Sequence, residues 1–370
     1  MTDRLSTLLH DEAGGIPVPP APGGVLAAGR REVRRRRTRT ALAGAVAAAL
    51  VAVAATVAVD RWTGGGDAIS PADRTAYREQ GAWIVDDRLH IAGHTVRIPD
   101  AVGMLYTAQG VLVGSLDGDT SQQVVTLVTP DGRTRDLGHL GGVAADPRSP
   151  EIVFARSTGD HTWQLVTWDL ATDEQRPLGE PFESGRSTSV ALGMSDPYVV
   201  FLRGQRMLTM DRHTGETGSL PQQDIGLTLD QSFGPAGYLT SSEASPEHVT
   251  EWLVRSLPDG RLVGSFPDDG AQAASVSPDG RYLETGSEDV VRVYDVATGA
   301  RLPLELPAHP TEVGWTPDGD LVAPSADRDT VLVCSPTTGA CDDTGTPVGD
   351  RVTVVRGSVN SGLNAPTGGP

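Results

Sequence analysis

The two cysteines are the side chains best placed by their spacing to form a covalent bond. Cys334 and Cys341 lie in the segment VCSPTTGAC, where a Pro-Thr-Thr-Gly turn folds one strand back so that the thiols can face each other. In an oxidising compartment such a pair forms a disulfide, and closing this short loop contributes about 2.5 kcal/mol in the chain-entropy model. Two unrelated thiols are the alternative, because a zinc site would need further ligands.

The histidine pair and the acidic segments that could bind a metal ion are more simply explained as hairpin and turn residues. His90 and His94 are four residues apart, but Gly93 and the surrounding alternation place both on a hairpin rather than on one helix face. The acidic segments 117–119 and 267–270 could offer oxygen ligands to calcium, yet they are typical of solvated turns. Without a Ser-His-Asp order or a phosphate-binding Gly-Lys loop, the sequence predicts no catalytic, cofactor-binding or metal-binding residue.

An apolar segment near the N-terminus predicts a transmembrane helix. Residues 41–59 read ALAGAVAAALVAVAATVAV and contain no charge. A helix of this length is about 28 Å long, close to the roughly 30 Å thickness of the hydrocarbon core. Arginines that flank a span stay on the cytoplasmic side, and those before this segment include Arg34, Arg35, Arg36, Arg37 and Arg39. We therefore expect a single-pass plasma-membrane protein with residues 1–39 in the cytoplasm and residues 60–370 outside.

Two other interpretations of residues 41–59 stay open. About half of the segment is alanine, and Ala-Val-Ala at 52–54 or Thr-Val-Ala at 56–58 would suit the cleavage site of a signal peptide. The long stretch before the apolar core argues against cleavage, because it exceeds an ordinary n-region. A buried helix of a soluble protein is the third interpretation. An anchor and a cleaved signal both export the rest of the chain, in agreement with the disulfide prediction.

The composition of the exported part predicts an all-β fold and argues against nucleic acid as a partner. The chain contains 44 Gly and 27 Pro, and short Val- and Leu-rich runs lie between turn residues, as many short strands require. All 30 basic residues are arginine, which indicates a GC-rich bacterial genome of actinobacterial type. Residues 60–370 contain 22 Arg against 44 acidic residues, whereas phosphate binding needs a basic surface.

A motif of an apolar strand, Asp, two residues, Thr and a turn residue recurs along the chain. It reads VTWDLATDE, LTMDRHTGE and VRVYDVATGA, with the acidic residues Asp169, Asp211 and Asp295, and Ser335 takes the acidic place in LVCSPTTGA. Weaker units of the same kind lie between these motifs and before them. When they are counted as well, successive units are about 41.5 residues apart on average. A Pro-Asp-Gly turn recurs in the other half of the unit, at 278–280 and 317–319. This period is typical of four-stranded propeller blades, and seven blades, or six, fit the sequence.

The units resemble the WD-repeat and TolB-like β-propellers. Gly138-His139 and Trp168-Asp169 are separated by 28 residues, as in a WD-repeat, and Tyr294-Asp295 resembles the dipeptide that closes the third strand of a blade. The resemblance covers about 280 residues, and one unit has the full signature. It implies that His139 bonds within its own blade, and it assigns structural roles in the blades to His139, Trp168, Asp169, Asp211, Tyr294 and Asp295.

The two ends of the predicted propeller fit a closed ring. The first unit, residues 82–98, supplies only a strand pair, and residues 350–359 read DRVTVVRGSV, one or two strands without a neighbouring partner. Sharing one blade between these ends would remove exposed sheet edges. We therefore predict a propeller over residues 82–358, preceded by a linker at 60–80 and followed by a disordered tail at 359–370.

These features lead us to expect a membrane-anchored, extracytoplasmic β-propeller that binds or scaffolds a protein. Propellers present loops on a rigid ring, so a partner meets one face or the central channel. The alternative is an enzyme, a propeller hydrolase or lactonase with acidic residues in that channel, and fold alone does not separate the two classes. We expect no cofactor, and the sequence does not identify the protein partner.

Overall fold

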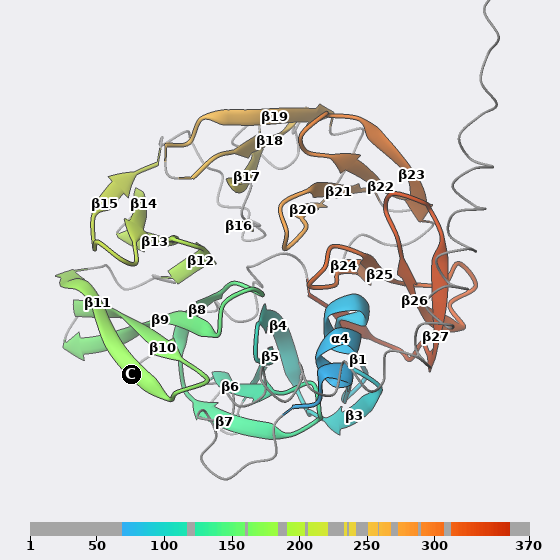
Figure 1. Ribbon diagram of the computed structural model, residues 1–370, viewed down its shortest axis with the longest axis horizontal. Helices are drawn as coiled ribbons and strands as arrows, with labels where there is room; N and C mark the ends of the chain where they lie inside the picture. Colours follow the sequence, from blue (N-terminus) through green and yellow to red (C-terminus); the bar gives the residue numbers. More distant parts are fainter. Residues whose placement is uncertain are drawn as a thin grey trace, which may run out of the picture. The chain divides into compact units, whose positions relative to one another are not determined.

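The computed structural model describes residues 69–116, 123–159, 162–183, 191–203, 206–220, 233–234, 237–241, 251–257, 259–267, 273–287, 290–306 and 312–355. Within these residues the strands form seven four-stranded antiparallel sheets. Figure 1 shows the sheets arranged around a central axis, with one edge strand of each sheet nearest the centre. This is the arrangement of a β-propeller, as the sequence predicts.

The sheets are numbered here in chain order. The first sheet contains β28 (Val352–Val354), β1 (Ala82–Val85), β2 (Arg88–Ile91) and β3 (His94–Arg97). The second contains β4 (Ala101–Thr107), β5 (Gly110–Leu116), β6 (Gln123–Val128) and β7 (Thr134–Gly138). The third contains β8 (Gly141–Ala145), β9 (Glu151–Gly159), β10 (Thr162–Asp169) and β11 (Glu174–Glu183).

The remaining four sheets follow the same order from the innermost strand outwards. The fourth contains β12 (Ala191–Ser195), β13 (Tyr198–Arg203), β14 (Arg206–Asp211) and β15 (Thr217–Ser219). The fifth contains β16 (Phe233–Gly234), β17 (Gly237–Ser241), β18 (Glu251–Arg255) and β19 (Leu262–Pro267). The sixth contains β20 (Ala273–Val276), β21 (Tyr282–Gly286), β22 (Val291–Asp295) and β23 (Arg301–Leu306). The seventh contains β24 (Gly314–Trp315), β25 (Leu321–Pro324), β26 (Thr330–Cys334) and β27 (Cys341–Pro347).

The recurring aspartates fix the turns between the third and fourth strands. Asp169 Oδ1 accepts backbone hydrogen bonds at 2.8 and 3.1 Å from residues two and three positions further on. Asp211 does the same, and the N–H of Thr214 holds its pKa below the ordinary value. The hydroxyl of Thr298 lowers the pKa of Asp295 in the same way. The repeated Asp and Thr thus have a local cause, since both satisfy backbone donors in a tight turn.

The first sheet joins the two ends of the described propeller. Strand β28 pairs with β1, with Trp83 opposite Val354 and Val85 opposite Val352. The four side chains are buried in one cluster with residues of the seventh sheet. The predicted sharing of one sheet by the two chain ends is therefore confirmed for these strands.

The hydrophobic core lies between neighbouring sheets rather than within any one of them. Leu112 of the second sheet and Phe154 of the third are buried in one cluster. Tyr282 and Trp315 stack across the sixth and seventh sheets, with ring centroids 6.4 Å apart. Full burial of a side chain such as Leu112 or Phe154 contributes about 1.5–3 kcal/mol, so the sheets stabilise one another as a closed set.

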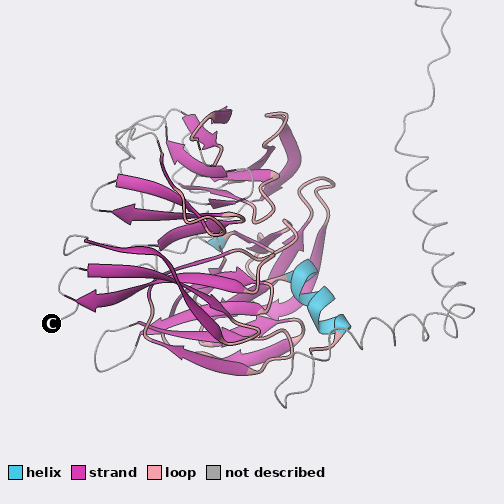
Figure 2. Cartoon of the chain, turned by 60° about the vertical axis from the view of Figure 1, so that its left-hand side comes forward, coloured by secondary structure: helices cyan, strands magenta, loops and turns pink. Residues whose placement is uncertain are grey.

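Helix α4 (Pro71–Gln80) occupies the second half of the segment that we expected to be a linker. Ser70 caps its N-terminus by accepting a hydrogen bond from the N–H of Asp73, and Pro71 suits the first turn because it lacks an N–H. Tyr77 is buried against the second sheet. The helix forms because of this cap and this one anchoring side chain, and Figure 2 shows it at one end of the strands.

No helix within the described ranges is long and apolar enough to cross a membrane. The predicted cytoplasmic segment 1–39, with its arginines, lies outside those ranges. So do the predicted span at 41–59 and the C-terminal tail at 359–370.

Candidate functional site

The antiparallel order of the strands brings one set of turns to the same end of the propeller. In each sheet the turn between the first and second strands, counted from the centre, emerges at the same end as the turn between the third and fourth. We call this end the turn face. Its central turns carry charged side chains from several sheets, namely Asp146, Arg148, Asp196, Asp279, Asp318 and Asp320.

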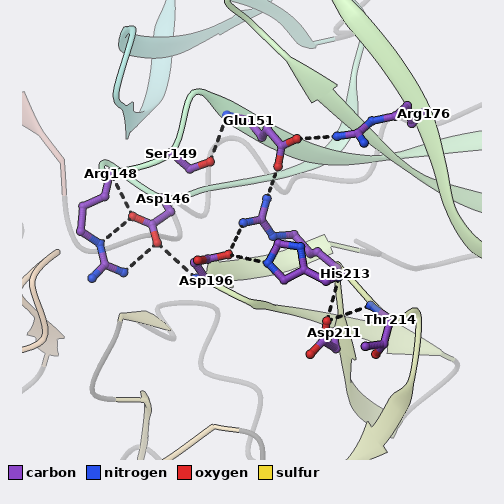
Figure 3. Close-up of polar contacts among 10 residues, drawn as sticks. Asp146, Arg148, Ser149, Glu151, Arg176, Asp196, Asp211, His213 and Thr214 are labelled. Atoms are coloured by element: carbon purple, nitrogen blue, oxygen red, sulfur yellow. Dashed lines mark hydrogen bonds and ion pairs between the residues drawn. The ribbon is translucent and has the colours of Figure 1, made fainter.

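Asp146 and Arg148 form a closed pair in the turn between β8 and β9 (Figure 3). The Asp146 side chain is 3% exposed and accepts hydrogen bonds from Arg148 Nε at 3.1 Å and Nη2 at 2.8 Å. It also accepts one from the N–H of Asp196, in the fourth sheet. The hydrogen bonds from Arg148 to Asp146 raise the pKa of Arg148, and the charges of Asp196 and Asp279 act in the same direction.

Arg212 links the third and fourth sheets through a second group of ion pairs (Figure 3). Its side chain is 6% exposed and donates to Glu151, and also to Asp196 Oδ1 at 2.6 Å. Glu151 in turn accepts from Arg176 at 2.8 Å. Every carboxylate in this group pairs with a guanidinium, so none is available as a catalytic base or nucleophile. The ion pairs instead link the third sheet to the fourth.

Three carboxylates of the sixth and seventh sheets lie close together, and Asp279 accepts hydrogen bonds from the hydroxyl of Ser277 and the N–H of Arg281. We call Asp279, Asp318 and Asp320 the acidic mouth. The carboxylate of Asp279 lies 3.2 Å from the position that a Cβ would take on Gly319. Asp318 pairs with Arg78 of helix α4 at 2.7 Å.

Asp320 is the most perturbed member of the acidic mouth. It is half-buried, and its carboxylate accepts no hydrogen bond from the residues that the structure describes. Burial raises its pKa to about 6, and the charges of Asp318 and Asp279 act in the same direction. A half-buried acid without a donor is destabilised when ionised, and a cation placed nearby would relieve it.

The described part of the chain contains no group of three or more His, Cys, Asp or Glu side chains that could hold a metal ion. His90 stacks on Trp83, with ring centroids 6.0 Å apart. His94 instead lies 3.7 Å from Asp73 of helix α4. The acidic segment 117–119 and residues 268–270 lie outside the described ranges.

A pocket of about 390 Å³ lies between the second and third sheets. This pocket could not be predicted from the sequence, because its walls come from both sheets and from separate segments of the chain. Its lining residues are Leu137, His139, Leu140, Gly141, Phe154, Ala155, Arg156, Ser157, Trp163, Trp168 and Gln175.

The cysteines of the predicted disulfide and the predicted blade residues lie within the sheets or in the turns next to them. Cys334 and Cys341 are directly opposite on β26 and β27 and are joined by a disulfide. His139 Nδ1 donates to the carbonyl of Gln123 at 3.1 Å, in the sheet that precedes it. Trp168 is buried and its Nε1 donates to Asp173 at 2.9 Å. Tyr294 is buried between the fifth and sixth sheets.

No family model and no curated protein matches the chain. Among solved structures it is similar to Hsv2 from Kluyveromyces lactis, at 15% identity over 65% of this chain and 75% of that one, with a TM-score of 0.42. It is also similar to a putative 6-phosphogluconolactonase from Bacteroides uniformis, at 17% identity over 74% of this chain and 98% of that one, with a TM-score of 0.46. A third similar structure is TolB from Acinetobacter baumannii, at 13% identity over 74% and 64%, with a TM-score of 0.36. The fold assignment rests on the strand pairings and not on these distant matches.

Proposed function

We propose that this protein is a membrane-anchored, extracytoplasmic β-propeller with seven blades, one for each four-stranded sheet, and that it binds a protein partner at the acidic mouth. In this proposal residues 41–59 span the plasma membrane, Arg34 to Arg37 and Arg39 keep the N-terminus in the cytoplasm, and a basic segment of the partner enters the acidic mouth. The proposal classes the protein as a binding or scaffolding module.

The half-buried carboxylate of Asp320, which accepts no hydrogen bond from the described residues and lies near two further carboxylates, is the observation that carries this proposal. Asp279, Asp318 and Asp320 come from the turns of two neighbouring sheets. Asp318 pairs with Arg78 and the charge of Asp279 acts on Arg148, whereas the Asp320 carboxylate has no arginine partner within the described residues. A lysine or arginine of a partner would stabilise ionised Asp320 and offset the repulsion from Asp279. Asp279 accepts hydrogen bonds from the hydroxyl of Ser277 and the N–H of Arg281, and Asp318 is held by Arg78, so two carboxylates of the acidic mouth are fixed before a ligand binds.

Charge-dependent capture from an envelope extract tests the proposal. The bait is the full-length protein in detergent, compared with an Asp279→Asn/Asp320→Asn double variant. Glu183→Gln is the matched control, because Glu183 is an exposed carboxylate on the outer strand β11. We expect a basic partner to be retained by the wild type and the control and to be lost from the double variant. Equal retention of that partner by the double variant would exclude the acidic mouth as its binding site.

A further inference from the structure

We propose that the pocket between the second and third sheets binds an aromatic carboxylate, that is, a ligand with an aromatic ring a few bonds from a carboxylate group. Such a ligand could be a free small molecule or the end of a peptide. The inference concerns a different site from the acidic mouth and does not depend on the function proposed above.

The walls of the pocket are suited to an aromatic ring. Its volume of about 390 Å³ lies within the roughly 300–1,000 Å³ typical of small-molecule sites. Trp163, Trp168 and Phe154 line it, and Trp163 is only half-buried, so part of its ring is accessible. Aromatic rings prefer offset or edge-to-face packing against one another, which these side chains can offer to a ligand.

The aromatic walls are held in position by the protein itself. Trp168 donates its indole N–H to Asp173, and the guanidinium of Arg135 lies over its ring at 5.7 Å. The rings of Phe154 and Trp168 are 6.1 Å apart and tilted by 58°. The site therefore needs little reordering when a ring enters, which favours binding.

Arg156 supplies the positive charge that selects a carboxylate. Its guanidinium lies 5.4 Å from the centre of the Phe154 ring and donates to the amide oxygen of Gln175. It pairs with no carboxylate of the described residues, whereas Arg148, Arg176 and Arg212 all do. A guanidinium binds a carboxylate through two parallel hydrogen bonds, and a neutral amide acceptor is readily exchanged for a charged one.

His139 adds a hydrogen-bonding group whose donor and acceptor nitrogens can be assigned. Because its Nδ1 faces the carbonyl oxygen of Gln123, this nitrogen must donate, and in the neutral ring Nε2 is left as an acceptor. A ligand with a hydroxyl or N–H group on its ring or chain could donate to it. The single guanidinium matches one negative charge, so we favour a carboxylate over a doubly charged phosphate.

Binding of 3-phenylpropionate and of its neutral analogue 3-phenylpropanamide tests the inference. Both are titrated into the full-length protein in detergent and followed by ligand-observed NMR and by quenching of tryptophan fluorescence. We expect the acid to bind in the millimolar range or tighter, and the amide at least tenfold more weakly. Absence of acid binding at 10 mM, or equal affinity for acid and amide, would overturn the inference.

Three variants locate the site. Arg156→Gln should remove the preference for the acid over the amide, and Trp163→Ala should weaken both ligands. Arg206→Gln, on an exposed arginine of the fourth sheet, should change neither. Melting curves verify that the variants are folded, and an unchanged acid preference in folded Arg156→Gln would refute the role of Arg156.

A second binding experiment, with peptides, distinguishes a small molecule from a peptide terminus as the source of the ligand. A pentapeptide that ends in a free C-terminal Phe is compared with the same peptide carrying a C-terminal amide. Tighter binding of the free-acid peptide than of 3-phenylpropionate indicates a protein terminus as the natural ligand. Binding of 3-phenylpropionate alone indicates a small molecule.

Discussion

Replacing Tyr77 measures how strongly helix α4 holds the propeller. The Tyr77 side chain is 2% exposed, and its hydroxyl lies 2.9 Å from the carbonyl oxygen of Thr107 and 2.7 Å from that of Gly110. Burial raises the pKa of Tyr77 well above its ordinary value, so the hydroxyl remains a donor at any working pH. Tyr77→Phe removes this donor and keeps the ring. The carbonyl of Gly110 still accepts from the Thr107 hydroxyl, so the expected cost is about 1 kcal/mol, at the lower end of the range for a lost buried hydrogen bond.

Tyr77→Ala also removes the ring and leaves a cavity, so its expected cost rises to about 3–5 kcal/mol. Urea unfolding of the three proteins, followed by tryptophan fluorescence, gives these differences from the midpoint shifts. Arg78→Ala is the control on the same helix, because the Arg78 side chain is 65% exposed and an exposed ion pair contributes about 0–1 kcal/mol. If Tyr77→Ala unfolds within about 1 kcal/mol of the wild type, the helix is not held by Tyr77 and the reasoning fails.

Three further predictions concern the rest of the fold. The pKa of Asp320 is raised from 3.8 to about 6, so the folded state binds this proton more tightly and the stability due to Asp320 falls as the pH rises from about 4 to 6. Asp320→Asn should therefore melt above the wild type at pH 7.5, with a difference that vanishes near pH 4, and equal melting curves at both pH values would contradict this. Replacing Cys334 and Cys341 with Ala should cost about 2.5 kcal/mol, measured by denaturation, and unchanged stability would show that the loop is ordered without the bond. Deleting residues 348–370 removes β28 and should lower the melting temperature sharply, so an unaltered melting curve would refute closure through this strand.

Features with a local cause could be predicted from the sequence. The turn aspartates accept from backbone N–H groups only two or three residues away, as Asp169 and Asp211 do. Their recurrence was therefore visible as a motif and gave the period of the sheets. The unpaired strand near residue 352 also indicated the shared first sheet, because a lone strand needs a partner.

Features that depend on contacts between distant segments could not be predicted. Tyr77 bonds to carbonyls 30 and 33 residues away, and nothing in the helix sequence indicates this. Asp279 and Asp320 lie 41 positions apart in a sequence rich in Asp, and only the ring brings their turns together. His139 and Trp168 form a spaced pair in the sequence, but their shared place in one pocket follows from the packing of two sheets.

The most direct test of the acidic mouth is its coupling of cation binding to proton release. Octalysine is titrated calorimetrically into the full-length protein in detergent at pH 6 and low salt, in two buffers with different enthalpies of ionisation. With a pKa of about 6, Asp320 is half protonated, so a bound cation should release up to about half a proton per peptide. We predict this release in the wild type and its loss in Asp320→Asn. Octalysine binding with the same enthalpy in both buffers, unchanged by Asp320→Asn, would contradict the proposal.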